Sequence, residues 1–225
     1  MAEDAIEFPL AGEQMLALAE RALLWPRTRT LFVADVHFGK DATFREHLRW
    51  VPPGTTTDDL ARLRGLLFRY AVDRLVILGD AFHSESAQED QTFHELRTWR
   101  ASLDATVILI EGNHDRRAKA IANELNFEQP EPDFSLPPFD LRHRPTTASS
   151  KRYVLCGHLH PVVTARGLAR QRLQLRCFWA SSFQCVLPAF GGFTGGYPIR
   201  PAPDDRVILI ADGKVLAAAR PSANK

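Results

Sequence analysis

The sequence predicts an α/β fold, because short apolar runs alternate with polar stretches that have helical periodicity. Each apolar run is rich in Val, Ile and Leu, which is typical of a buried strand. The runs cover residues 30–37, 74–80, 105–115 and 152–160. Two intervening stretches, 55–73 and 86–104, space apolar residues three and four positions apart and are expected to be amphipathic helices.

The later part of the chain is richer in extended runs than in helical ones. Residues 173–180, 185–190, 206–211 and 214–219 are consistent with further strands, some of them antiparallel. Three proline-rich passages, at 51–54, 128–139 and 197–203, are predicted to be loops rather than domain linkers. Residues 10–25 fit a helix and a strand about equally well. Without an internal repeat or a low-complexity tail, residues 1–225 are expected to form one domain.

The composition is that of an ordinary globular protein, with 45% hydrophobic and 24% charged residues. No apolar run reaches the length of about 18 residues that a membrane helix needs. The acidic start lacks the order of a signal peptide. Cys156, Cys177 and Cys185 are too few and too scattered for a disulfide framework or a zinc knuckle. We therefore expect a reduced, cytoplasmic protein with no membrane partner.

The formal net charge of +1 hides an asymmetry along the chain. Residues 141–203 contain nine Arg and Lys residues and no Asp or Glu, a balance of +9. Such a split suggests a polyanionic partner for the basic part. The alternative is that these side chains are scattered over a solvated surface.

Each of the four apolar runs ends in residue types that bind metals. In chain order these are Asp35 and His37, then Asp80, then Asn113 and His114, then His158 and His160. Ligands of open α/β sheets bind at the carboxyl edge of the strands, so these side chains are expected to meet. Asp35 and His37 are two positions apart, as are His158 and His160, and on an extended chain this spacing puts both side chains on one side.

Glycine precedes a polar residue in three of these motifs, at Gly79, Gly112 and Gly157. Each lies where the strand must turn sharply, which glycine does at little cost.

Taken in order, the motifs resemble those of the calcineurin-like metallophosphoesterase superfamily. They are D-x-H at 35–37, G-D at 79–80, G-N-H-D at 112–115, a lone His143 and G-H-x-H at 157–160. More narrowly, ADVHFGK at 34–40, GD-x-x-HS at 79–84 and LPAFGGFTGG at 187–196 resemble the bacterial ligase-associated DNA-damage-response endonucleases. The resemblance covers nearly the whole chain. It implies a calcineurin-like sandwich of two mixed β-sheets flanked by α-helices, and manganese-dependent cleavage of DNA phosphodiesters.

The resemblance also implies a role for each motif residue. One metal would be held by Asp35, His37 and His160, the other by Asn113, His143 and His158, and Asp80 would bridge them. His143 has no glycine beside it and is chosen because the superfamily places a lone His between the G-N-H-D and G-H-x-H motifs. His114 would touch the scissile phosphate, and Asp115 would orient the His114 imidazole.

These residue types suit the chemistry independently of the resemblance. Two metals about 3.5–4 Å apart can share a hydroxide, direct it at phosphorus and hold the non-bridging oxygens. Two carboxylates and a hydroxide around two divalent ions leave a net charge of about +1, which attracts a phosphate ester. Four imidazoles and a carboxamide favour Mn²⁺, Fe or Zn over Mg²⁺. His114 is not counted as a ligand and so can donate a proton to the leaving oxygen.

Four further residues are candidates for contacts with the substrate. His83 follows Asp80 by three residues and either contacts phosphate or is a plain loop residue. Arg144, Lys151 and Arg152 flank the ligand-bearing strands and are the first candidates for binding a DNA backbone. The segment GGFTGG at 191–196 lacks the P-loop and GxGxxG patterns and is interpreted as a tight loop near the site.

We therefore expect a binuclear-metal phosphodiesterase that acts as a DNA endonuclease in DNA repair. The first alternative is a phosphodiesterase or phosphatase for small nucleotides or phosphoproteins, because one fold can serve all of them. The second is a non-catalytic binding module, which should lack some ligands or His114, whereas this sequence has them all. A DNA ligase, helicase or exonuclease acting beside the protein is implied by the resemblance alone.

Overall fold

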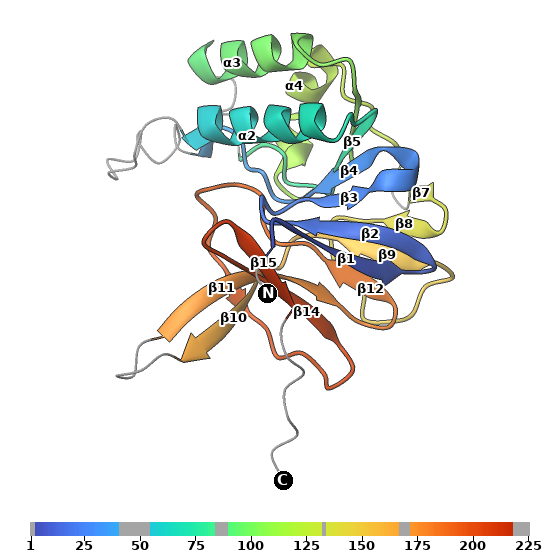
Figure 1. Ribbon diagram of the computed structural model, residues 1–225. Coiled ribbons are helices and arrows are strands. Elements are labelled where there is room, and N and C mark those ends of the chain that lie inside the picture. Colours follow the sequence, from blue (N-terminus) through green and yellow to red (C-terminus); the bar gives the residue numbers. More distant parts are fainter. Residues whose placement is uncertain (1–2, 41–54, 84–89, 132–133, 167–171, 218–225) are drawn as a thin grey trace.

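Two β-sheets pack face to face, and helices cover the outer face of one of them (Figure 1). The computed structural model describes residues 3–40, 55–83, 90–131, 134–166 and 172–217. The predicted α/β sandwich of two mixed sheets is confirmed. Within these ranges the helices flank the sandwich on one side only, against the first sheet.

The first sheet keeps its strands in chain order. It consists of β1 (Ala5–Leu10), β2 (Glu13–Leu18), β3 (Leu23–Trp25), β4 (Thr30–Val33), β5 (Arg74–Ile77) and β6 (Thr106–Leu109). Strands β1 to β4 pair antiparallel, whereas β4, β5 and β6 are parallel. Helix α2 (Thr55–Arg69) lies between β4 and β5 in the chain, and α3 (Asp90–Ala101) lies between β5 and β6.

The parallel strands are buried on both faces, which explains why they are continuous apolar runs in the sequence. Leu31 and Val33 of β4 pack in the cluster that α2 and α3 cover. Phe32, between them, packs in a second cluster that fills the space between the two sheets. Successive side chains of a strand point to opposite faces, so one short run serves both cores.

The second sheet is assembled from the later half of the chain. Its strand order is β13 (Tyr197–Pro198), β10 (Pro161–Arg166), β11 (Arg172–Ala180), β12 (Gln184–Val186), β9 (Tyr153–Cys156), β8 (Phe139–Leu141) and β7 (Ser135–Leu136), with β14 (Arg206–Ala211) paired to β11 and to β15 (Lys214–Ala217). Strands β8, β9 and β12 are mutually parallel, and β10 is parallel to β13. Three short helices, η1 (Pro26–Thr28), η3 (Asp115–Arg117) and α4 (Lys119–Glu124), complete the described elements.

Three details differ from the sequence-based expectations or settle them. Residues 10–25, which fit a helix and a strand equally well, form β2, β3 and the end of β1. The proline-rich passages at 128–139 and 197–203 are not only loops, because they contain β7 and β13. The passage at 51–54 lies outside the described residues.

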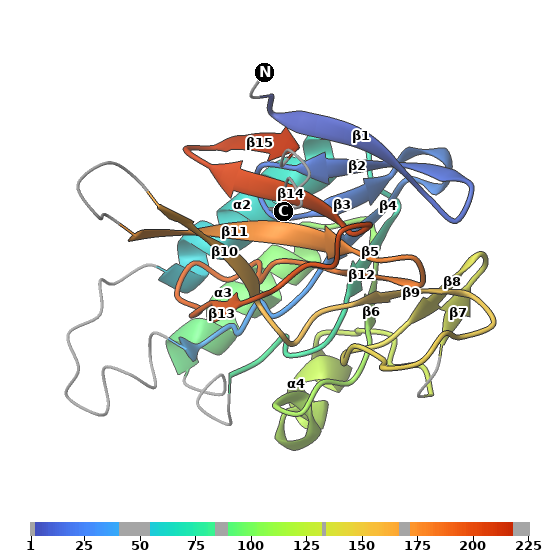
Figure 2. The ribbon, with the colours of Figure 1, turned by 90° about the horizontal axis from the view of Figure 1, so that it is seen from below.

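The edges of the two sheets meet near both ends of the described chain. The backbones of Glu3 and Val215 exchange two hydrogen bonds, of 3.2 and 2.7 Å, and β1 runs beside β15 (Figure 2). Cys156, Cys177 and Cys185 are free thiols buried in the second sheet. No helix in the described part of the chain combines the length and apolar character needed to cross a membrane.

Candidate functional site

The predicted metal ligands gather where the carboxyl ends of β4, β5, β8 and β9 meet. The side chains form two groups, and within each group the ligand atoms all lie within 4.8 Å of one another. The first triad is Asp35, His37 and His160, and the second triad is Asp80, His143 and His158. The Asp and His residues fall into the same two groups that the family resemblance implied, with Asp80, the expected bridge, in the second group.

Most of these residues have an unusual backbone conformation. Asp35, His37, Asp80, His158 and His160 have positive φ angles between 49° and 71°. Non-glycine residues rarely adopt this left-handed region, and each instance costs on the order of 1 kcal/mol. Such strain persists only where surrounding contacts fix the backbone, and it concentrates at functional sites.

The left-handed residues correct one step of the sequence-based reasoning. Strand β4 ends at Val33, before Asp35, and β9 ends at Cys156, before His158. These ligands are therefore not part of an extended strand. The expectation that residues two positions apart place their side chains on one side does not apply to them. Asp35 and His37 still converge on one triad, but His158 and His160 turn to different triads.

Each aspartate uses one oxygen for the backbone and directs the other at a histidine. The Oδ2 atom of Asp35 accepts a hydrogen bond from the His158 N–H at 2.8 Å, and its Oδ1 lies 3.4 Å from His160 Nε2. Similarly, Asp80 Oδ1 accepts from the His114 N–H at 2.9 Å, and Oδ2 lies 3.4 Å from His143 Nε2. The backbone bonds fix both carboxylates, so the second oxygens are held ready to bind a cation.

The first triad contains buried polar atoms that a metal would satisfy. Asp35 has 0% exposure, yet its Oδ1 atom has no hydrogen-bond partner among the described residues, and neither does Nδ1 of the buried His37. Asp35 Oδ2 is paired with the His158 N–H, but leaving Oδ1 without a partner is costly, and buried polar atoms are rarely left unsatisfied. The donor set of one carboxylate and two imidazoles therefore fits a divalent transition metal.

The second triad fits a metal for a different reason. His143 Nδ1 lies 3.0 Å from the Leu78 carbonyl, which directs the Nδ1 proton to that oxygen and leaves Nε2 as the ligand atom. His143 Nε2 lies 3.1 Å from Asn113 Oδ1 and 3.0 Å from His158 Nδ1. Asp80 Oδ2 is also close to His143 Nε2. The lone pairs of these nitrogen and oxygen atoms therefore share one region, where a proton or a metal cation is needed to offset their mutual repulsion.

The pKa values agree with this arrangement. Burial and, to a smaller extent, the nearby Lys40 charge lower the pKa of His37 to about 3, so the His37 imidazole is neutral, as a ligand must be. Burial opposes charge on His143 as well, but hydrogen bonding and attraction to Asp80 outweigh it and raise the His143 pKa. The same pair holds the pKa of Asp80 below its usual value despite burial. The second triad therefore favours positive charge.

All three motif glycines make room for the ligands, and a Cβ atom on Gly112 would lie 2.3 Å from Asp80 Oδ1. A Cβ atom on Gly79 would lie 2.2 Å from His143 Nδ1, and one on Gly157 would lie 2.7 Å from Asp35 Oδ2. The predicted sharp turn applies to Gly79, whose φ is +81°, whereas Gly157 is required for close approach alone.

His114 lies beside both triads and belongs to neither. Its Nδ1 atom is 3.1 Å from the His83 carbonyl, and its ring is 5.3 Å from the His37 ring. When Nδ1 carries a proton and donates it to the carbonyl in a hydrogen bond, Nε2 is the nitrogen that can exchange a proton with the substrate. His83 also lies beside the site, with its ring stacked on His114 at 5.5 Å, and burial together with the Lys40 charge lowers the His83 pKa to about 4.

The Asp115 carboxylate, predicted to orient the His114 imidazole, binds backbone N–H groups in this structure. It accepts hydrogen bonds from the Gly112 N–H at 2.9 Å and the Phe82 N–H at 3.1 Å, and burial raises its pKa to about 6. The contact to the His114 imidazole comes from the His83 carbonyl instead. Asp115 therefore joins two loops of the site.

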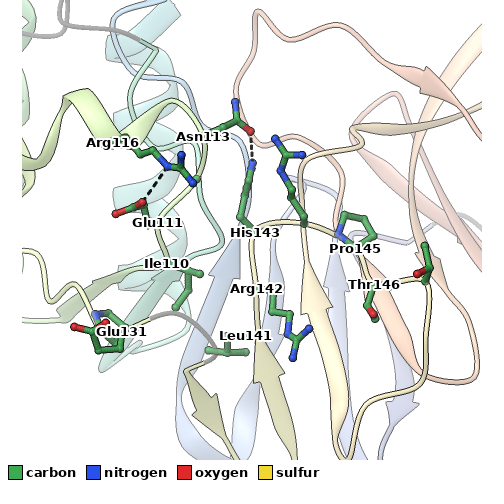
Figure 3. Close-up of a pocket in the computed structure, with 14 residues that line it drawn as sticks. Ile110, Glu111, Asn113, Arg116, Glu131, Leu141, Arg142, His143, Pro145 and Thr146 are labelled. Atoms are coloured by element: carbon green, nitrogen blue, oxygen red, sulfur yellow. Dashed lines mark hydrogen bonds and ion pairs between the residues drawn. The ribbon is translucent and has the colours of Figure 1, made fainter.

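A cleft of about 810 Å³ opens beside the second triad, and Asn113 and His143 form part of its wall (Figure 3). Arg144, a candidate for contact with the substrate, lines the cleft, and so do Arg116 and Arg142, which the sequence analysis did not single out. Arg116 pairs with Glu111 at 3.3 Å. Arg116 and Arg142 could have been identified from their positions in the sequence, because Arg116 directly follows the G-N-H-D motif and Arg142 directly precedes His143.

Lys151 and Arg152 lie elsewhere. Both precede β9, whereas His158 follows it, and β9 alone separates the two ends by about 13 Å at roughly 3.3 Å per residue. Arg152 pairs with Asp140 at 3.5 Å. The structure therefore does not support these two side chains as neighbours of the metals.

Comparison with known proteins finds a matching family model and similar solved structures. The family model described as calcineurin-like phosphoesterase matches residues 28–185. Among solved structures, the nuclease MPE of Pseudomonas putida is 38% identical with a TM-score of 0.80, over 91% of this chain and 96% of that chain. The phosphoesterase Yfce from E. coli is 14% identical with a TM-score of 0.41, over 87% of this chain and 94% of that chain. Curated protein sequences gave no match.

Proposed function

Since the chain belongs to the calcineurin-like phosphoesterase family, we propose that it is a binuclear-metal phosphodiesterase that cleaves DNA as an endonuclease. The observation that carries the proposal is the pair of adjacent triads, each with one oxygen of its aspartate fixed by a backbone N–H. The similarity to a nuclease over 91% of the chain supports a nucleic acid as the substrate.

The first metal would be held by Asp35, His37 and His160, and the second by His143, His158 and the Asn113 carboxamide. Asp80 would bind both, because it belongs to the second triad and its charge also acts on His37. The mixture of imidazole and oxygen donors supports Mn²⁺, with Fe or Zn as the alternatives. When bound, the metals would supply Lewis-acid activation of water and of the phosphate.

The chain's own residues would then manage the proton and the substrate. His114 would donate a proton from Nε2 to the leaving oxygen, with the His83 carbonyl holding the ring in place. The cleft beside Asn113 and His143 would receive the DNA strand, with Arg144 at the phosphates. A place in DNA repair, beside a ligase, helicase and exonuclease, rests on the sequence resemblance.

The test is to incubate purified protein with plasmid DNA, DNA oligonucleotides and mononucleotides, with and without Mn²⁺. The proposal predicts cleavage of DNA that requires the metal and exceeds the turnover of mononucleotides. Faster hydrolysis of a nucleotide than of any DNA would leave a phosphoesterase but remove the endonuclease. No hydrolysis despite stoichiometric metal binding would favour a binding module.

A further inference from the structure

The glycine-rich loop, residues 187–196, packs against the loop that carries Asp35 and His37. The Phe190 N–H donates to the Ala34 carbonyl at 2.8 Å, and the Gly191 N–H donates to the Asp35 carbonyl at 3.2 Å. A Cβ atom on Gly191 would lie 2.3 Å from the Val36 carbonyl oxygen, so a larger residue does not fit. The loop lies beyond residues 28–185 that match the family model, and the proposed chemistry gives it no role.

Arg176 of β11 holds the glycine-rich loop in this position. One guanidinium nitrogen donates to the Ala189 carbonyl at 2.8 Å and to Thr194 Oγ1 at 2.9 Å. The other donates to the Thr194 carbonyl at 2.8 Å. A guanidinium presents several donors in a fixed plane, so Arg176 can bind both ends of the loop in a way that lysine cannot.

Helix α2 holds the same loop from the other side. Asp59 Oδ2 accepts from the Gly192 N–H at 2.9 Å, while Oδ1 accepts from Arg62 at 2.8 Å. Arg62 also donates to the Phe190 carbonyl at 2.5 Å, and its guanidinium lies 4.1 Å from the centre of the Phe190 ring. Asp59 has only 4% exposure, so this network is inside the protein.

The second triad is anchored without this loop. His143 is held by the carbonyl of Leu78, which directly follows β5. Asp80 is held by the N–H of His114, in the loop that follows β6. Asp35 and His37 have the same left-handed backbone as Asp80 and His158, but it is the loop of Asp35 that receives the hydrogen bonds of the glycine-rich loop, at the Ala34 and Asp35 carbonyls.

We propose that Arg176 is a positioning residue for the first triad: it fixes the glycine-rich loop against residues 34–36 and thereby sets the metal affinity of Asp35, His37 and His160. The inference rests on the proposed function to the extent that the triads bind metal. Loss of groups that orient metal ligands typically weakens metal affinity about 10- to 100-fold.

The experiment measures Mn²⁺ binding by calorimetry in full-length protein with one triad disabled at a time. In a His158→Ala background the first triad is read alone, and in a His160→Ala background the second is read alone. Arg176→Gln should weaken Mn²⁺ binding about tenfold or more in the first background and less than about twofold in the second. Arg176→Lys should fall between Arg176→Gln and the parent.

The matched control is Arg172→Gln, an exposed arginine of the same strand, which should change neither affinity. Thr194→Val, which removes one acceptor of Arg176 while keeping the side-chain shape, gives a second test if Arg176→Gln does not fold. Equal weakening of both triads, or of neither, would overturn the inference and leave the proposed function standing. Absence of Mn²⁺ binding in both backgrounds with Arg176 intact would overturn the proposed function, and the inference with it.

Discussion

The two triads contain the same residue types, one aspartate and two histidines, but they are built in different ways. The first takes Asp35 and His37 from one loop, and that loop is supported from behind by the glycine-rich loop. The second takes Asp80, His143 and His158 from the ends of β5, β8 and β9, and it opens on the cleft. Ligands from several strand ends inherit their positions from the sheets, whereas neighbouring ligands on one loop need separate support.

The largest expected effect comes from the residue that would join the two triads. Asp80→Ala should reduce hydrolysis of DNA by about 10³-fold or more and lower the bound metal at both positions, because the residue would serve both metals. The measurement combines turnover with metal content by elemental analysis. If the first triad bound Mn²⁺ with unchanged affinity in Asp80→Ala protein, the triads would be independent and the bridging role would be wrong.

The next largest effect separates proton donation from metal binding. His114→Ala should keep both metals and lose about 10²- to 10⁴-fold in DNA cleavage, because the alkoxide leaving group needs a proton. A nitrophenyl phosphodiester, whose leaving group is already stable as an anion, should lose much less. Equal losses on the two substrates would assign His114 to phosphate positioning, and loss of a metal would make it a ligand.

A smaller, pH-dependent effect should be visible at the second triad. The pKa of His143 is raised by Asp80, so protons compete with metal at this ligand at a higher pH than at an ordinary histidine. In the His160→Ala background, Mn²⁺ affinity should be constant above the raised pKa and fall about tenfold for each pH unit below it. An affinity that stays level from pH 8 to pH 5 would show that His143 is not a ligand.

The smallest effect tests the cleft. Arg144→Gln should make the dependence of duplex DNA binding on log salt shallower by about 0.9 units, the amount for one lost phosphate contact, and should spare hydrolysis of the nitrophenyl ester. Arg152→Gln, which removes the same charge at the far end of β9, is the control and should leave the slope unchanged. The opposite ranking would place the DNA at the far end of β9, near Arg152.

The sequence alone was enough to predict the strands that carry the site. Residues 30–37 and 74–80 are apolar on both faces of their strands, and their polar ends could only lie at the sheet edge. The ligand residues were identifiable because Asp, Asn and His are conspicuous after such runs. Their division between two metals came from the family resemblance, since spacing on an extended strand would have grouped His158 with His160.

Features that depend on contacts far apart in the chain could not be predicted. The left-handed backbone at Asp35 and Asp80 has only a weak local sequence signal, the enrichment of Asp, Asn and His among non-glycine residues with positive φ, and the tertiary structure decides which of them adopt it. The orienting group for His114 is a backbone carbonyl, which every residue possesses. Lys151 and Arg152 are close to His158 in the sequence but are separated from it by the length of a strand.

The left-handed ligands imply a trade-off between stability and activity in this protein. Glycine adopts positive φ without steric cost, so a variant such as His160→Gly should relieve roughly 1 kcal/mol of backbone strain in the metal-free protein while removing a ligand, and the greater freedom of glycine in the unfolded chain offsets part of that gain. Selection for thermal stability alone would therefore erode the site one ligand at a time. The histidines and aspartates at these positions lower the stability of the metal-free protein slightly, and bound metals would restore that stability.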